Sequence, residues 1–112
     1  MKRGDICLVD LANNMGSEQG GIRPAVIVQN DVGNNFSPTT LICPLTSKTK
    51  QMDTTHVVLS PKEAAVIKDS VVLCEQARVI DKQRIKKKLG KIESQMKIEE
   101  INRRIAISFG LV

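Results

Sequence analysis

Three short polar stretches contain residue types that bind or cut a phosphodiester. The first, 16–24, combines glycines with a hydroxyl, a carboxylate and an amide, and it ends in Arg23-Pro24. Glycines let the backbone approach a ligand closely, and the planar guanidinium of arginine matches the oxygens of a phosphate. Arg23, held at the entrance of an apolar strand, is therefore a candidate phosphate ligand. The alternative is a flexible hairpin loop with a surface arginine.

Two further stretches are weaker candidates. Residues 45–48 place the hydroxyls of Thr46 and Ser47 and the cation of Lys48 at the end of an apolar run, although a solvated turn is the simpler explanation. Residues 75–78 read Glu-Gln-Ala-Arg inside a predicted strand. Strand alternation would place Gln76 and Arg78 on one face, which either lines a groove or is simply exposed.

The cysteines and the single histidine do not indicate a metal site. Cys7, Cys43 and Cys74 lie far apart beside aliphatic residues, so they form neither a disulfide framework nor a zinc spacing. We expect three buried thiols. His56 has a side chain suited to proton transfer, but it enters an apolar strand away from the polar stretches, so we expect a structural role. The sequence predicts no metal and no cofactor.

Length and composition indicate one soluble domain over residues 1–112. No run approaches the roughly 18 apolar residues of a membrane span, and the N-terminus lacks the features of a secretion signal. We therefore expect a cytoplasmic protein without a membrane partner.

The positive charge is concentrated in one part of the chain. The net charge is +5, and residues 82–104 hold nine basic and three acidic side chains. A basic surface favours a polyanion such as nucleic acid. Aromatic residues make up only 2% of the chain, which leaves few side chains on which bases can stack.

Short apolar runs separated by turn residues predict a mainly β protein. We expect strands over 6–11, 24–29, 39–46, 55–59 and 70–79. The run 24–29 is almost continuously apolar and should be central, whereas Pro44 predicts an edge position or a bulge in the third strand. Connections this short favour antiparallel pairing.

Three helices are expected between and after these strands. A capping box with proline at the first helical position predicts a short helix from Ser60 to about residue 65. Asp81 is expected to cap a basic helix through residue 89, which Gly90 would end. Isoleucines at 98, 101 and 105 predict an amphipathic helix over 94–109, packed against a small barrel-like sheet.

In this order, the polar stretches and strands resemble the MazF/PemK family of toxins. The matching segments are 2–6, 16–31, 44–46, 55–57, 69–71 and 75–78. The combination of Arg-Gly-Asp before the first strand with Gly-Ser-Glu-Gln-Gly-Gly-x-Arg-Pro is specific to the family. The resemblance implies an SH3-like small barrel of about five to seven strands, with short helices and a C-terminal helix, that forms a homodimer.

The same resemblance implies the toxin of a type II toxin–antitoxin pair, with a cognate antitoxin as partner. Members are mRNA interferases, which cut single-stranded RNA at a short sequence and leave a 2′,3′-cyclic phosphate and a 5′-hydroxyl. The family's catalytic arginine falls on Arg23, its catalytic threonine on Thr46 and its loop glutamate on Glu18.

RNA carries its own nucleophile, the 2′-hydroxyl, so this reaction requires no metal. Arg23 would stabilise charge on the phosphate and Thr46 would orient it. Because arginine stays protonated at neutral pH, it is a poor base; Glu18 is a possible base if its loop folds over the phosphate, and the identity of the base stays open. Gln76 is the main candidate for reading a base edge; weaker RNA-binding candidates are Ser17, Gln19, Asn34 and Lys48.

Some assignments remain open. Phe36 either stacks on a base or fills the core. The basic segment 82–91 either holds flanking phosphates or forms a solvated helix face. Two other functions are compatible with the fold: a topoisomerase poison without a catalytic site, and a nucleic-acid-binding domain that cuts nothing.

Overall fold

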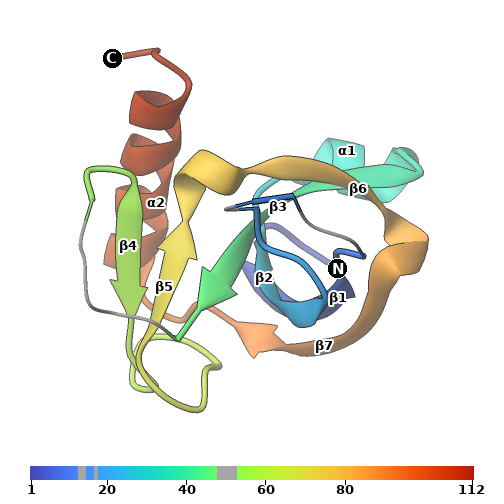
Figure 1. Cartoon of the computed structure of the whole chain (residues 1–112), viewed down its shortest axis with the longest axis horizontal. Helices are drawn as coiled ribbons and strands as arrows, with labels where there is room; N and C mark the ends of the chain where they lie inside the picture. The colour runs from blue at the N-terminus through green and yellow to red at the C-terminus, as the bar shows by residue number, and fades with distance from the viewer. Residues whose placement is uncertain (13–14, 17, 48–52) are drawn as a thin grey trace.

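The computed structural model describes residues 1–12, 15–16, 18–47 and 53–112 (Figure 1). The described strands are β1 (Asp5–Asp10), β2 (Ile22–Ile27), β3 (Thr39–Thr46), β4 (His56–Leu59), β5 (Ser70–Leu73), β6 (Arg78–Asp81) and β7 (Ile85–Lys91). The helices are α1 (Asp31–Phe36) and α2 (Gln95–Ser108), with 3₁₀ turns η1 (Cys74–Gln76) and η2 (Lys82–Arg84).

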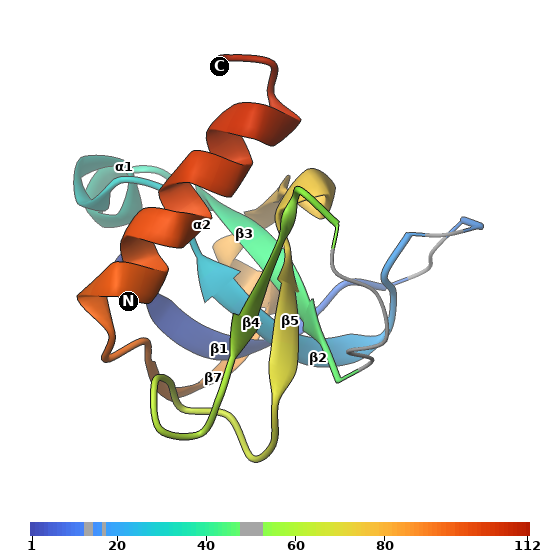
Figure 2. The same cartoon turned by 90° about the vertical axis from the view of Figure 1, so that its left-hand side faces the viewer.

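The strands form one curled, antiparallel sheet. Their order is β4-β5-β3-β2-β1-β7, and β6 also pairs with β3. In Figure 1 the sheet curls so that β1, β2, β3, β6 and β7 enclose one side of the molecule, and α2 lies beside β4 (Figures 1 and 2). The predicted fold, a mainly β barrel-like sheet with short helices and a C-terminal helix, is confirmed.

Proline at position 44 shapes the middle of the sheet. On one edge β3 pairs with β2; on the other it pairs with β6 over Thr39–Ile42 and with β5 over Leu45 and Thr46. Neither of these last two pairings includes Cys43 or Pro44. The expected edge position is therefore wrong, because β3 is central. The expected irregularity falls on the segment beside β3, where η1 interrupts the strand pairing opposite Pro44, because proline has no N–H to donate.

The predicted strand over 70–79 is accordingly wrong over 74–77 and right on either side. The chain leaves β5 after Leu73, turns through η1 with Ala77 N donating to Cys74 O (3.3 Å), and resumes pairing as β6. The β-branched residues on both sides of the turn predict strands correctly, but the sequence does not show that the partner strand has a gap at this point.

Two predicted helices are also wrong. The capping-box contact forms, with Ser60 N donating to Glu63 Oε1 (3.0 Å), but the chain then bridges from Ala64 to Ile92 instead of continuing as a helix. Asp81 caps η2 by accepting from Gln83 N, yet the residues after η2 form β7 because β1 offers them an open edge. Pairing with β1 overrides the helix preference of lysine-rich sequence.

Two apolar clusters stabilise the fold. The larger lies under α2 and includes Ile6, Val26, Leu59 and Ile101; the smaller includes Val9, Leu11 and Ile42. Ser94 caps α2, and Ile98 and Ile105 pack beside the buried Ile101 as the helical spacing predicted. Within the described residues, no helix is long and apolar enough to cross a membrane.

A short helix that the sequence analysis missed, α1, precedes β3. Asn30 caps it by accepting from Gly33 N. Three of its six residues are Asp or Asn and one is a glycine, a composition that is more typical of a loop. The pairing of both flanking strands, β2 and β3, fixes the ends of the connection that contains this six-residue helix.

Candidate active site

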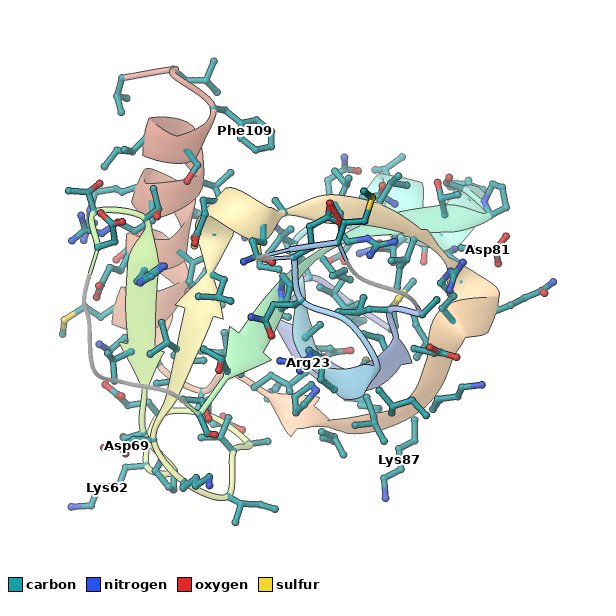
Figure 3. All side chains as sticks on the ribbon, viewed as in Figure 1. Arg23, Lys62, Asp69, Asp81, Lys87 and Phe109 are labelled. Atoms are coloured by element: carbon teal, nitrogen blue, oxygen red, sulfur yellow. The ribbon has the colours of Figure 1, made fainter. Side chains whose placement is uncertain are left out.

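A pocket of about 1180 Å³ opens where loop 16–21 meets the start of β2 and the end of β3. The three predicted catalytic residues, Glu18, Arg23 and Thr46, all line it. The opposite wall comes from segment 61–70 and from Leu89 of β7. Figure 3 shows Arg23 toward the middle of the view, with the loop that carries Lys62 and Asp69 further out.

Sheet register explains why Arg23 and Thr46 share a pocket. Ala25 of β2 pairs with Pro44 of β3 in antiparallel register. Continuing that register by two residues on each strand brings Arg23 opposite Thr46. Because side chains alternate along a strand, a shift of two residues keeps both on one face of the sheet. Residues 23 apart in sequence thus become neighbours across two strands.

The guanidinium of Arg23 is held by its own loop. Nε of Arg23 donates to Gly20 O (2.9 Å), and Nη1 donates to Oε1 of Gln19. Arg23 is half-buried and Pro24 follows it in the strand. Two of the five guanidinium donors therefore orient the group at the mouth of the pocket, and a phosphate needs only two more for a bidentate contact.

Glu18 lies between two pockets. It is exposed, its backbone N donates to Met15 O (3.0 Å), and it lines both the large pocket and a smaller one of about 390 Å³. Glu18 therefore lies where a general base would have access to a substrate in the larger pocket. Ser17, next to it, falls outside the described residues, as does Lys48.

Gln76 belongs to the smaller pocket. Its neighbours Glu75, Ala77 and Arg78 line the same pocket, together with Gln19. The predicted alternation of these four residues across a strand is therefore wrong, because η1 turns them toward one cavity. Oε1 of Gln76 accepts a hydrogen bond from Gln19 N (2.8 Å), which connects η1 to the loop that precedes Arg23.

Asn34 lies away from both pockets. It is buried in α1, where its Nδ2 donates to Gln29 O (2.9 Å) and its Oδ1 accepts from Thr40 Oγ1 (2.7 Å). These bonds hold α1 against β3. Phe36, at the end of α1, is 84% exposed, so the expectation that it fills the core is wrong.

The histidine and the cysteines lie outside the large pocket. His56 Nε2 is 3.0 Å from Glu75 Oε2, and this pair joins β4 to η1, which fits a structural role. All three cysteines are free and buried. A hydrogen bond with Cys74, together with burial, raises the pKa of the Cys43 thiol, and burial raises that of Cys7. Among the described residues, no group of three or more His, Cys, Asp and Glu side chains could hold a metal ion.

Comparison with known proteins identifies the family. A model described as the PemK-like, MazF-like toxin of type II toxin–antitoxin systems matches residues 2–109. The chain belongs to this family. The endoribonuclease MazF of Staphylococcus saprophyticus is 48% identical over 112 residues, covering 99% of this chain and 92% of the relative. The chain is thus a homologue of an endoribonuclease.

Solved structures share the MazF fold at low sequence identity. MazF from Deinococcus radiodurans superposes with a TM-score of 0.83 at 23% identity, covering 98% of this chain and 96% of that one. An endoribonuclease from Mycobacterial species, solved in complex with its cognate antitoxin, gives a TM-score of 0.83 at 22% identity, with 100% and 97% coverage.

Sequence reasoning missed one wall of the pocket in this MazF-like toxin. Segment 61–70 contributes Ala65, Val66, Ile67 and Lys68 to the lining. The only sequence signal for this wall was a short apolar run, 64–67, that has neither strand nor helix periodicity. Its last residue, Ile67, is fully exposed. The segment docks on β7, where Ala65 N donates to Lys91 O (3.1 Å).

Proposed function

We propose that this MazF homologue cuts single-stranded RNA at a short recognition sequence by attack of a 2′-oxygen on the adjacent phosphorus. The O2′–P bond forms while the P–O5′ bond breaks, which leaves a 2′,3′-cyclic phosphate and a 5′-hydroxyl. The 2′-hydroxyl loses one proton and the 5′-oxygen gains one, with no metal required. The supporting observation is that Glu18, Arg23 and Thr46 line a single pocket.

Each of these three residues has a distinct role in the proposal. Arg23 binds the scissile phosphate and stabilises the charge that develops on the phosphorane. The hydroxyl of Thr46, opposite Arg23 across the two strands, orients the phosphate or the 2′-hydroxyl for in-line attack. Glu18, exposed at the mouth of the pocket, takes the 2′ proton.

Recognition of the RNA sequence is assigned to the smaller pocket and the loops around it. The amide of Gln76 reads a base edge, and Ser17, Gln19 and Lys48 contribute weaker contacts. Asn34 is a poorer candidate, because its side-chain amide is used inside the fold. The exposed lysines of β7, next to the pocket-lining Leu89, hold the phosphates of flanking nucleotides.

The proposed biological setting follows from this activity. Residues 1–112 act as one domain that forms a homodimer in the cytoplasm, where messages are translated. Cutting those messages arrests growth until a cognate antitoxin blocks the toxin. Because the chain carries a net charge of +5, we expect the antitoxin segment that binds it to be acidic.

The decisive experiment incubates the purified protein with a long RNA in EDTA. We expect discrete fragments whose 5′-hydroxyl ends accept phosphate from a kinase without prior phosphatase treatment, and sequencing those ends gives the recognition sequence. The Arg23→Ala protein, purified identically, controls for contaminating nucleases. Intact RNA would indicate a topoisomerase poison or a binding domain instead, and cleavage that appears only with added Mg²⁺ would overturn the metal-independent mechanism.

A further inference from the structure

Gln19 connects the two pockets of the site through hydrogen bonds made by its main chain and its side chain. Its backbone N donates to Oε1 of Gln76 (2.8 Å) in the smaller pocket. Its own Oε1 accepts from Nη1 of Arg23 in the larger one. Gln19 is half-buried and lines both cavities. It is therefore bonded to both the candidate base reader and the candidate phosphate ligand.

The contacts around Gln19 restrict how Arg23 can turn. The adjacent Gly20 carbonyl accepts from Nε of Arg23 (2.9 Å), so residues 19 and 20 hold two edges of the same guanidinium. Loop 16–21 contains three glycines, which give the backbone little rigidity of its own. The bond from Gln19 N to Gln76 anchors this loop to η1, and η1 in turn is held by the His56–Glu75 pair.

We propose that Gln19 is a positioning residue that couples base recognition at Gln76 to the orientation of Arg23 at the scissile phosphate. This inference rests on the proposed RNA-cleaving function. A base edge that engages the Gln76 amide changes the hydrogen bond between Gln76 and Gln19 N. The loop then shifts, and the side chain of Gln19 carries that shift to the guanidinium. RNA with the correct base thereby places Arg23 for attack, whereas other RNA binds without being cut efficiently.

The first test separates binding from catalysis with variants at position 19. Gln19→Met removes the acceptor for Arg23 while keeping the length of the side chain. We expect a single-turnover cleavage rate roughly 100-fold lower, the usual cost of misplacing a reacting group by about 1 Å. The affinity for an RNA with a 2′-deoxy nucleotide at the cleavage position should change little. Gln95→Met, at an exposed glutamine of α2, is the matched control.

A conservative variant distinguishes positioning from direct RNA contact. Gln19→Glu keeps an oxygen acceptor for Arg23 but loses the amide donor. We expect it to recover most of the cleavage rate at saturating RNA, although its negative charge weakens RNA binding. If Gln19→Glu is as slow as Gln19→Met at saturation, the acceptor to Arg23 is not what matters, and the inference is wrong.

The coupling itself is tested by combining changes at the two ends of the path. Gln76→Ala and Gln19→Met both act on Arg23 through residue 19. The fold-decrease in cleavage rate of the double variant should therefore be smaller than the product of the two single fold-decreases. Losses that multiply in full would show that Gln76 and Gln19 act independently, which would contradict the coupling.

A spectroscopic measurement tests the same path without RNA. The Nε–H signal of Arg23, assigned by its absence in Arg23→Lys, should shift in Gln76→Ala. The shift should shrink when Gln19→Met is also present. If the wild-type protein cuts no RNA, the proposed function fails, but this signal still decides whether Gln76 and Arg23 are linked through Gln19. No shift in Gln76→Ala overturns the linkage.

Discussion

At the scale of single residues, the orientation of Arg23 is the central feature of the site. Gly20 and Gln19 each accept a hydrogen bond from its guanidinium, and the register of β2 and β3 brings Thr46 opposite it. A guanidinium held by two hydrogen bonds needs only a small shift to stabilise a phosphorane.

Removing either side chain should abolish most cleavage. We expect Arg23→Ala and Thr46→Ala each to lower the cleavage rate by roughly 100-fold or more, as loss of one electrostatic or hydrogen-bonding group at a transition state usually does. Circular dichroism and the melting temperature should stay close to those of the parent protein. Arg103→Ala, at an exposed arginine of α2, should retain activity. Full activity in either site variant would contradict the assignment.

Two carboxylates should make the stability of the fold depend on pH in the acid range. A hydrogen bond from Arg3 N lowers the pKa of Asp31 below 3.8, and one from Ser60 N lowers the pKa of Glu63 below 4.5. A lowered folded pKa stabilises the protein above the unfolded value, and this contribution is lost as pH falls through the folded value. Urea denaturation between neutral pH and about pH 3 should show this loss. Glu63→Gln should weaken the pH dependence of the free energy of unfolding. An unchanged profile of unfolding free energy against pH would contradict the contribution of Glu63.

At the scale of elements, sequence patterns predicted those whose burial is regular. β1, β2 and β3 follow from short apolar runs, and α2 follows from the helical spacing of its isoleucines. β7 did not, because Ile85–Lys91 is rich in lysine and becomes a strand only through pairing with β1. η1 was missed for a similar reason: it forms opposite Cys43 and Pro44, where β3 changes partners.

One glycine of β7 holds the pocket wall in place. Gly90 has a φ of +152°, and a Cβ built on it would lie 2.3 Å from Cβ of Ala65, which lines the pocket. Gly90→Ala should push segment 61–70 away from the strand, destabilise the protein by about 1–3 kcal/mol, and lower the cleavage rate. Chemical denaturation and cleavage assays check both effects.

A second-site change provides the control for this prediction. Ala65→Gly removes the methyl group that the new Cβ would meet, so the double variant should recover part of the lost cleavage. The strain of a side chain at positive φ would remain. No recovery would mean that backbone strain alone, and not contact with Ala65, disturbs the pocket.

The lysines of β7 should contribute to RNA affinity without affecting chemistry. Lys88 pairs with the buried Asp5 carboxylate (Nζ–Oδ2 3.5 Å), so it is a poor choice for substitution. Lys87 is exposed and extends away from the sheet (Figure 3). Lys87→Gln should lower the salt dependence of binding to a long RNA by about 0.7 in log–log slope. Arg103→Gln removes an equal charge on α2 and should leave this salt dependence unchanged. If both variants lower the slope equally, the net charge of the protein, and not a contact made by Lys87, determines it.

At the scale of the whole molecule, the site draws on segments far apart in sequence. Arg23, Thr46 and Glu18 could be predicted as site residues from the family motif alone, since each lies in a matching stretch. The role of Gln19 and the wall formed by Ala65 and its neighbours could not, because they depend on how η1 and β7 fold back on the sheet.

The buried thiols should report on global unfolding. Cys7, Cys43 and Cys74 are each 0% exposed, and burial contributes to the raised pKa of Cys7 and Cys43. Because the thiolate is the reactive form, a thiol reagent such as an aromatic disulfide should label the native protein very slowly. Labelling should accelerate in parallel with urea unfolding. Rapid labelling of any thiol without denaturant would reveal local opening of the sheet.

The covering of the larger core by α2 has a consequence for how the protein is made. Ile101 of this helix is buried among residues of β1, β2 and β4, and Arg104 Nη1 donates to Thr54 O just before β4. A nascent chain in which the ribosome has not yet completed α2 leaves that apolar surface exposed. We therefore expect the growing polypeptide to be inactive toward the message being translated until synthesis has passed the last turn of the helix.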